Sequence, residues 1–171
     1  MFCADYIASF IYHAALTLGL AKAKKSSEYG DQISRFQSAP LHLYSLGAAA
    51  GFMGAASVFP FDFVRRGALP GQKVTLRHGM STVPYATVFF GLYFHNRDRE
   101  STPSQCKWAL ASAAGAALAE IPFDKAKLAM MGDRKTMVFA SLLYVPFGAL
   151  MLVMYDKALP KLQERVDRMD F

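Results

Sequence analysis

Apolar residues in this chain are concentrated in five long runs separated by short polar segments. The runs approach the length of about 20 residues that an α-helix needs to cross the hydrocarbon core of a bilayer. Gly, Pro and charged residues gather between them, as is typical of loops. The pattern predicts an all-α membrane protein with about five transmembrane helices, at residues 4–22, 41–63, 80–95, 105–123 and 136–156, and loops at 23–39, 64–79, 96–104 and 124–135.

The runs differ in composition. The second, SLGAAAGFMGAAS, and the fourth, WALASAAGAALAE, are rich in small residues, which allow transmembrane backbones to pack closely. The third, VPYATVFFGLYF, and the fifth, LLYVPFGALMLVMY, are aromatic and aliphatic. We therefore interpret the glycines of the small-residue helices as packing residues, namely Gly47, Gly51, Gly54 and Gly115.

The alternation of small-residue and aromatic helices reflects an internal repeat. Each copy has a small-residue helix, the motif Pro-Phe-Asp-x-x-basic, a short loop and a proline-bearing aromatic helix that ends in Tyr. Four landmarks that recur at one offset without a gap indicate a duplication. We divide the chain into an N-terminal helix with its loop (1–40), repeat one (41–103), repeat two (104–158) and a polar tail (159–171). The landmarks, 62 residues apart, are Pro60 and Pro122, Asp62 and Asp124, Pro84 and Pro146, and Tyr93 and Tyr155.

The Pro-Phe-Asp motifs combine a helix breaker with charge near a predicted membrane boundary. Proline removes a backbone hydrogen bond, so Pro60 and Pro122 are expected to mark bends. The aspartate that follows is costly in a membrane unless it is paired, and the basic residue three positions on lies on the next helical turn. Snorkelling of these charges into the lipid headgroups is the alternative. The charged residues are Asp62 and Arg65 in copy one, and Asp124 and Lys127 in copy two.

Composition and charge support a lipid environment. The chain of 171 residues is 53% hydrophobic, above the roughly 45–50% of typical soluble domains. The net charge of +6 is spread in short clusters between apolar runs, which indicates membrane loops and not a nucleic-acid surface. The first run is too long for a signal-peptide core and no basic region precedes it, so we expect a retained membrane helix. A soluble all-helical protein is disfavoured because the apolar segments lack polar faces.

No pattern in the chain favours catalysis, a metal or a cofactor. Cys3 and Cys106 have no CxxC partner, and the four histidines have no metal-ligand spacing. His13 and His42 lie near predicted membrane boundaries, where haem or quinone ligation is conceivable. A single histidine within a membrane more often forms a hydrogen bond to a neighbouring helix. We therefore expect that the protein is not an enzyme.

Taken together, these motifs resemble the mitochondrial carrier family over residues 41–158. PFDFVR and PFDKAK match the family's motif at the end of its odd-numbered helices, and Pro146 with Tyr155 and Asp156 matches the motif of its even-numbered helices. Pro84 and Tyr93 match the latter motif in part. The resemblance implies a bundle of tandem two-helix repeats in the mitochondrial inner membrane, with ion pairs between repeats that open and close during alternating access.

The chain departs from the family where transport would be performed. The family has three copies of the unit, whereas this chain has two copies and one additional N-terminal helix. Only the Asp62–Lys127 pair between copies remains possible, and Asp156 is left as an isolated fragment of the gate on the opposite side. Ser81 and Leu143 stand where the family often has a basic substrate contact. Loss of these groups predicts loss of transport.

The sequence therefore favours a carrier-derived, non-transporting structural subunit of a mitochondrial inner-membrane complex, such as a respiratory complex or the ATP synthase. A minimal mitochondrial solute carrier that acts as a dimer is the alternative. The expected location is the mitochondrial inner membrane, with several spans. The expected partners are other subunits of the complex and membrane lipids, with a bound phospholipid such as cardiolipin possible, and no nucleic acid.

Overall fold

The computed structural model describes residues 3–25, 30–39, 41–67, 81–96, 101–123 and 132–168. Within these ranges the secondary structure is helical and contains no strand, so the predicted all-α class is confirmed. The helices are α1 (Cys3–Lys25), α2 (Gly30–Ser38), α3 (His42–Gly67), α4 (Thr82–Asn96), α5 (Thr102–Glu120), α7 (Arg134–Leu143) and α8 (Val145–Arg168).

Four of the predicted segments correspond to α1, α3, α4 and α5, but the region 23–39 is not simply a loop because it contains α2. This short helix is amphipathic: Ile33 and Phe36 lie three positions apart in an otherwise polar sequence. Asp31 in its first turn and Arg35 in its last turn complement the helix dipole. A search for long apolar runs misses a helix of this composition.

The fifth predicted segment, 136–156, is interrupted at Tyr144 and becomes α7 and α8. Proline has no backbone N–H to donate to a preceding turn, and it is tolerated where a helix begins. Pro146 therefore occupies the first turn of α8, and the amide of Gly148 donates to the carbonyl oxygen of Tyr144 at 2.9 Å. Pro84 has the equivalent place in the first turn of α4.

The two Pro-Phe-Asp motifs lie in different local structures. Pro60 lies inside α3, which continues to Gly67. Pro122 lies in a turn after α5, whose final turn is closed at Ile121, and the Phe123 amide donates to the carbonyl oxygen of Glu120 at 2.9 Å. Pro122, which we expected to mark a bend, therefore follows a helix end.

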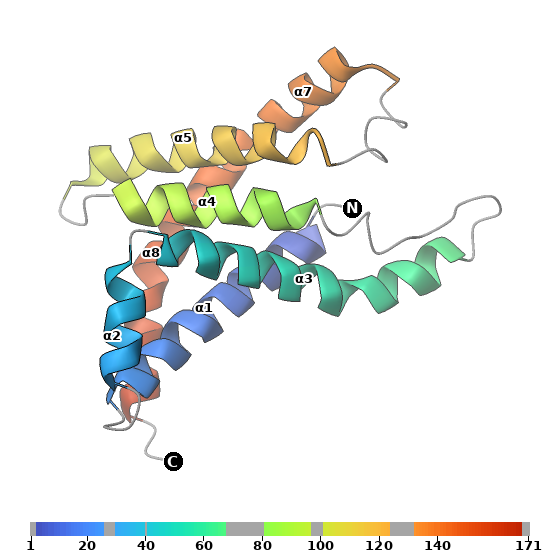
Figure 1. Cartoon of the computed structure of the whole chain (residues 1–171). Helices are drawn as coiled ribbons and strands as arrows, with labels where there is room; N and C mark the ends of the chain where they lie inside the picture. The colour runs from blue at the N-terminus through green and yellow to red at the C-terminus, as the bar shows by residue number, and fades with distance from the viewer. Residues whose placement is uncertain are drawn as a thin grey trace.

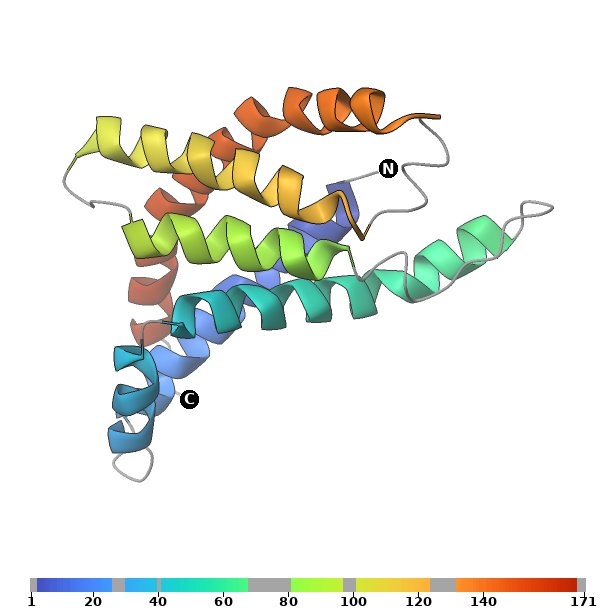
Figure 2. The same ribbon diagram turned by 45° about the horizontal axis from the view of Figure 1, so that its top comes forward.

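The helices are neighbours in space in nearly the order of the sequence. Figures 1 and 2 show α3, α4 and α5 side by side, with α1 crossing on the α3 side and α8 crossing behind them. The most extensive contacts are those of α1 with α3, α3 with α4, α4 with α5, and α5 with α8. Helix α1 also touches α8, so the first and last helices meet.

The core lies around α4, where large side chains face small ones. Its aromatic residues pack against alanines of α5 and against α8. This complementarity explains why aromatic and small-residue helices alternate in the sequence, because interiors require closely matched shapes. The buried core residues are Ala86, Phe89, Phe90, Tyr93, Ala109, Ala113, Ala116, Ala149 and Leu152.

Two of the expected packing glycines allow the backbones of α3 and α4 to approach. A Cβ atom on Gly47 would lie 2.6 Å from the Ala86 carbonyl oxygen, and one on Gly51 would lie 2.8 Å from the Ala86 Cβ. Gly54 is also buried on α3. Gly115 packs more loosely, since its added Cβ would lie 3.3 Å from a methyl group of Val88.

By length and composition, two stretches of the described helices can cross a membrane: His42–Phe61 and Val138–Arg168. The other expected spans do not meet this criterion within the described residues. Helix α4 has 15 residues, which is about 23 Å at 1.5 Å per residue, whereas a bilayer core is about 30 Å thick. The structure therefore supports a helical protein with two candidate spans, fewer than the five expected.

Candidate functional site

The two repeat-landmark tyrosines both form hydrogen bonds that join helices. The Tyr93 hydroxyl on α4 donates to a carboxylate oxygen of Asp156 on α8 at 3.1 Å, in a buried position. The Tyr155 hydroxyl lies 2.9 Å from Nδ1 of His13 on α1. Asp156 was expected to be an isolated fragment of a gate, but it is instead part of a buried interhelical contact.

His13 is the centre of the contact between the first and last helices. Its side chain is buried, and its ring stacks on Phe90 at a centroid distance of 4.1 Å and on Phe94 at 5.2 Å. Nε2 is also buried and has no hydrogen-bond partner among the described residues. These contacts agree with the expectation that this histidine forms a hydrogen bond to a neighbouring helix.

Aromatic rings fill the space between α1, α4 and α8. Phe10 makes edge-to-face contacts with Phe89 at 5.6 Å, with Phe90 at 5.1 Å and with Tyr155 at 5.2 Å between ring centroids. Such geometry is favourable for aromatic pairs. We call this set the aromatic cluster, and its members are Phe10, His13, Phe89, Phe90, Phe94 and Tyr155.

A cavity of about 430 Å³ lies next to the aromatic cluster and is lined by α1, α4, α5, α7 and α8. Its volume is within the range of small-molecule sites, about 300–1,000 Å³. The lining is mostly apolar, with Phe10 and Phe89 shared with the cluster. Tyr144 and Phe147 line the cavity and are each 59% exposed, so it reaches the outer surface of the bundle.

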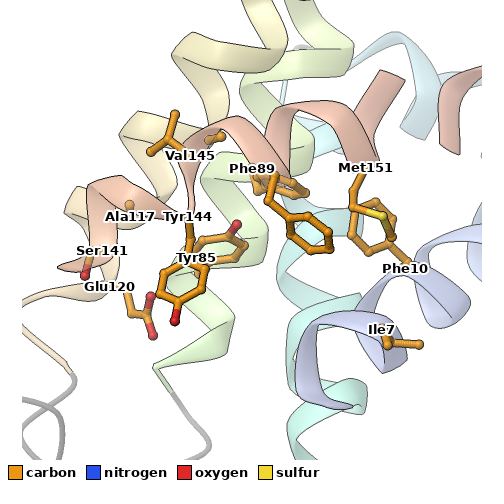
Figure 3. A pocket seen from close by; sticks show the side chains of 13 residues that line it. Ile7, Phe10, Tyr85, Phe89, Ala117, Glu120, Ser141, Tyr144, Val145 and Met151 are labelled. Atoms are coloured by element: carbon orange, nitrogen blue, oxygen red, sulfur yellow. The ribbon is translucent and has the colours of Figure 1, made fainter. Parts of the chain in front are cut away.

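Polar groups gather at one end of this cavity, as Figure 3 shows. Tyr85, Glu120, Ser141 and Tyr144 lie close to one another there, whereas Ile7, Phe10 and Met151 lie at the other end. Glu120 and Ser141 are only 4% and 5% exposed. The Ser141 hydroxyl is buried and has no hydrogen-bond partner among the described residues. We call these four residues the polar end.

Local structure explains the position of the polar end. Glu120 is the last residue of α5, and Tyr85 lies in the first turn of α4. Ser141 lies in the last turn of α7, and Tyr144 is the residue between α7 and α8. The start of α4, the end of α5 and the junction of α7 with α8 thus meet on one side of the bundle, while the apolar end of the cavity lies deeper between the helices.

The structure brings together only some of the predicted site residues. Tyr93 and Asp156 are buried, and Tyr155 is partly buried against the core. Pro84 is also partly buried, whereas Pro60, Pro122 and Pro146 are exposed. Asp124 and Lys127 lie outside the described residues. Asp62 and Arg65 lie within α3, but their side chains are outside the description. The proposed Asp62–Lys127 ion pair therefore stays a prediction.

Sequence reasoning missed the cavity and the roles of Phe10, Glu120 and Ser141. One feature of the sequence could have indicated a role for Glu120, because it is the acidic residue that ends a run of otherwise small and apolar residues. Within the described residues, no group of three or more His, Cys, Asp or Glu side chains gathers to form a metal site. The arrangement is one that can hold an amphiphilic molecule by shape and hydrogen bonds.

Comparison of the chain with protein-family models, curated proteins and solved structures gives no significant match. The fold and the cavity define a class, that of helical proteins with two candidate membrane spans and an internal apolar cavity. The likeness to the mitochondrial carriers rests on the sequence motifs alone.

Proposed function

We propose that this chain is a carrier-derived, non-transporting accessory subunit of a mitochondrial inner-membrane complex, either a respiratory complex or the ATP synthase. The proposed location in the mitochondrial inner membrane is based on the resemblance of the repeated motifs to the mitochondrial carriers. Its partners are then the neighbouring subunits of that complex and membrane lipids. On this proposal α1, α4 and α5 lie at membrane depth together with the two candidate spans, covered by those partners.

The aromatic cluster is the observation that carries the non-transporting part of the proposal. Alternating access requires a polar path between the repeats. Here Phe10 contacts Phe89, Phe90 and Tyr155 between the first, fourth and last helices. The nearby polar groups of Tyr93 and Asp156 are engaged with each other. A fixed packing role accounts for these contacts better than a solute path does.

The exposed apolar surface of the C-terminal span supports a role within an assembly. Of the most apolar window in Val138–Arg168, only 17% of the residues are buried by the chain itself. Phe139, Leu143 and Leu150 are each more than half exposed. Several exposed apolar side chains along one candidate span indicate a membrane or protein contact, so lipid and neighbouring subunits are expected to cover them.

The length of α8 also suits a subunit that extends beyond the bilayer. Its 24 residues continue through Pro160 into an exposed, charged end, a length of about 36 Å at 1.5 Å per residue. Arg168 and Glu164 form an ion pair on this exposed part. The proposed polar tail is therefore a continuation of the membrane helix, and it presents a rigid surface to a partner.

A native gel of mildly solubilised mitochondria tests the proposal. The gel is sliced and each slice is analysed by mass spectrometry for peptides of this chain. Co-migration with subunits of a respiratory complex or the ATP synthase, at the mass of that complex, is the expected result. Migration as a free monomer or a small oligomer would contradict it, as would recovery of the chain outside the inner-membrane fraction.

The alternative function is a minimal mitochondrial solute carrier that acts as a dimer. The observation that favours it is the cavity between α1, α4, α5 and α8, which lies inside the bundle. Uptake of labelled solutes into liposomes that contain the purified chain tests this alternative. Saturable uptake that empty liposomes lack would favour the carrier over the structural subunit.

A further inference from the structure

We propose that the cavity binds a single-chain neutral lipid whose head carries hydroxyl groups, of the monoacylglycerol kind. The head would lie at the polar end formed by Tyr85, Glu120, Ser141 and Tyr144, and the chain would extend toward Phe10 and Met151. The inference rests on the cavity alone and holds whether the chain is a subunit or a carrier.

The distribution of polar and apolar groups points to an amphiphile. A ligand that is polar throughout would lose hydration along the apolar lining without gaining hydrogen bonds. A ligand that is apolar throughout would leave the buried Ser141 hydroxyl without a partner. An acyl chain with a polar head satisfies both ends. The volume of about 430 Å³ accommodates one small ligand of drug-like size, and not a lipid with several chains.

The chemistry of the polar end selects the head. A carboxylate accepts hydrogen bonds, whereas serine and tyrosine hydroxyls both donate and accept them. Head hydroxyls can donate to Glu120 and exchange hydrogen bonds with Ser141. A phosphate or fatty-acid carboxylate would instead bring a negative charge next to the buried Glu120 carboxyl, in a lining whose described residues include no basic one to compensate it. The cavity is therefore a poor site for the phosphates of cardiolipin.

The surroundings supply an entry route. Tyr144, between α7 and α8, and Phe147, in the first turn of α8, line the cavity and are also exposed. A lipid that enters sideways between α7 and α8 would reach the cavity with its chain first. The polar end lies at helix termini on one side of the bundle, so the head would stay near that side while the acyl chain lies between the helices.

Native mass spectrometry of the full-length chain in detergent tests the proposal with three probes: monopalmitoylglycerol, palmitate and palmitoyl lysophosphatidic acid. The probes share one acyl chain and differ in the head. We expect the wild type to bind monopalmitoylglycerol at least about tenfold more tightly than either anion, a preference equivalent to 1.4 kcal/mol. Equal binding of all three would overturn the head selectivity.

Matched variants locate the site. Ala117→Phe fills the cavity and should abolish binding, whereas Leu118→Phe, at the next and 51% exposed position of the same helix, should leave it unchanged. Equal binding by both variants would place the lipid elsewhere and overturn the proposal. Thermal unfolding of each variant checks that it is folded, and Ser141→Ala, which removes only a hydroxyl group, should weaken binding without filling the cavity.

Glu120→Gln tests the charge. This variant keeps the size and the hydrogen-bonding oxygen but loses the negative charge, so palmitate binding should rise while monopalmitoylglycerol still binds. If palmitate bound the Glu120→Gln variant no better than the wild type, the role given to Glu120 would be contradicted.

If the wild type did not bind monopalmitoylglycerol at all, the lipid site would be overturned, and a side chain of a partner subunit would be the remaining occupant of the cavity. Neither result bears on whether the chain migrates with a respiratory complex, so the two proposals fail independently.

Discussion

The Tyr93 hydroxyl and the Asp156 carboxylate are joined by a buried hydrogen bond of 3.1 Å between α4 and α8. The residues come from different copies of the repeat, and Asp156 follows Tyr155, the repeat equivalent of Tyr93. In the carrier family this acidic position belongs to a gate that opens, according to the resemblance. Here it ties the aromatic helices of the two copies together.

Tyr93→Phe should destabilise the protein because it leaves a buried carboxylate oxygen without this donor. The expected loss is about 1–3 kcal/mol, measured as the free energy of unfolding in detergent. Tyr12→Phe on α1, which removes a hydroxyl from a partly buried residue, is the control and should change stability little. Equal losses for the two variants would contradict a specific Tyr93–Asp156 contact.

His13 offers a test that separates stacking from hydrogen bonding. His13→Phe keeps a ring between Phe90 and Phe94, loses the bond to Tyr155 and also removes the unpartnered Nε2. Its effect should be within about 1 kcal/mol. His13→Ala removes the ring and should cost about 3 kcal/mol. If the two variants were equally unstable in thermal unfolding, the hydrogen bond and not the stacking would dominate.

The approach of α3 to α4 should not tolerate a methyl group. Gly47→Ala would bring its Cβ to 2.6 Å from a backbone oxygen of Ala86, so the helices must separate at a cost of about 1–3 kcal/mol. Gly19→Ala in α1 is the matched control because nothing lies within 4 Å of its added Cβ. It should stabilise by about 0.5–1 kcal/mol through helix propensity. We therefore expect Gly47→Ala to lower the free energy of unfolding and Gly19→Ala to raise it.

The predicted ion pair between the repeats can be tested by charge exchange. Asp62→Lys and Lys127→Asp should each lower the amount of stable protein recovered from the membrane, because each places like charges together. The double variant should restore it if the two side chains pair. Lack of restoration in a recovery assay would show that these residues do not face each other.

The start of α7 should depend on pH through Asp133. The Thr136 amide donates to its carboxylate at 2.7 Å, and this bond holds the pKa of the carboxyl below its usual value. A lowered pKa means that the cap stabilises the helix above the ordinary aspartate pKa and is lost as the pH falls through the lowered value. Hydrogen exchange of the Thr136 amide, after correction for its intrinsic pH dependence, should therefore become faster in acid, and Asp133→Ala should remove this dependence.

The sequence predicted the positions of the helices better than the points at which the helices end or break. Apolar runs located α1, α3, α4 and α5 because a stretch that must be covered by lipid or core is recognisable without knowing its neighbours. The break at Tyr144 depends on the missing amide of Pro146, which was visible, but the same residue type continues a helix at Pro60. Tertiary packing decides between these outcomes.

The candidate site was less predictable because its residues are distant in sequence. Phe10, Phe89 and Met151 line one cavity only after three helices have packed. Gly91 was also overlooked, although an added Cβ there would clash with the Tyr44 ring. A single sequence indicates which residues are small or polar, but it does not indicate which of them will face each other.

The contact of His13 with Tyr155 has a consequence for how the chain is made. Because α1 leaves the ribosome first and α8 last, Phe10 and His13 can meet the rings of α4 midway through synthesis, but they meet Tyr155 only when synthesis is nearly complete. A chain that stops before α8 would leave Nδ1 of His13 without the Tyr155 hydroxyl and the aromatic cluster without one of its rings. The last helix therefore completes the packing of the first, and we expect a chain truncated before α8 to be less stable than the full chain.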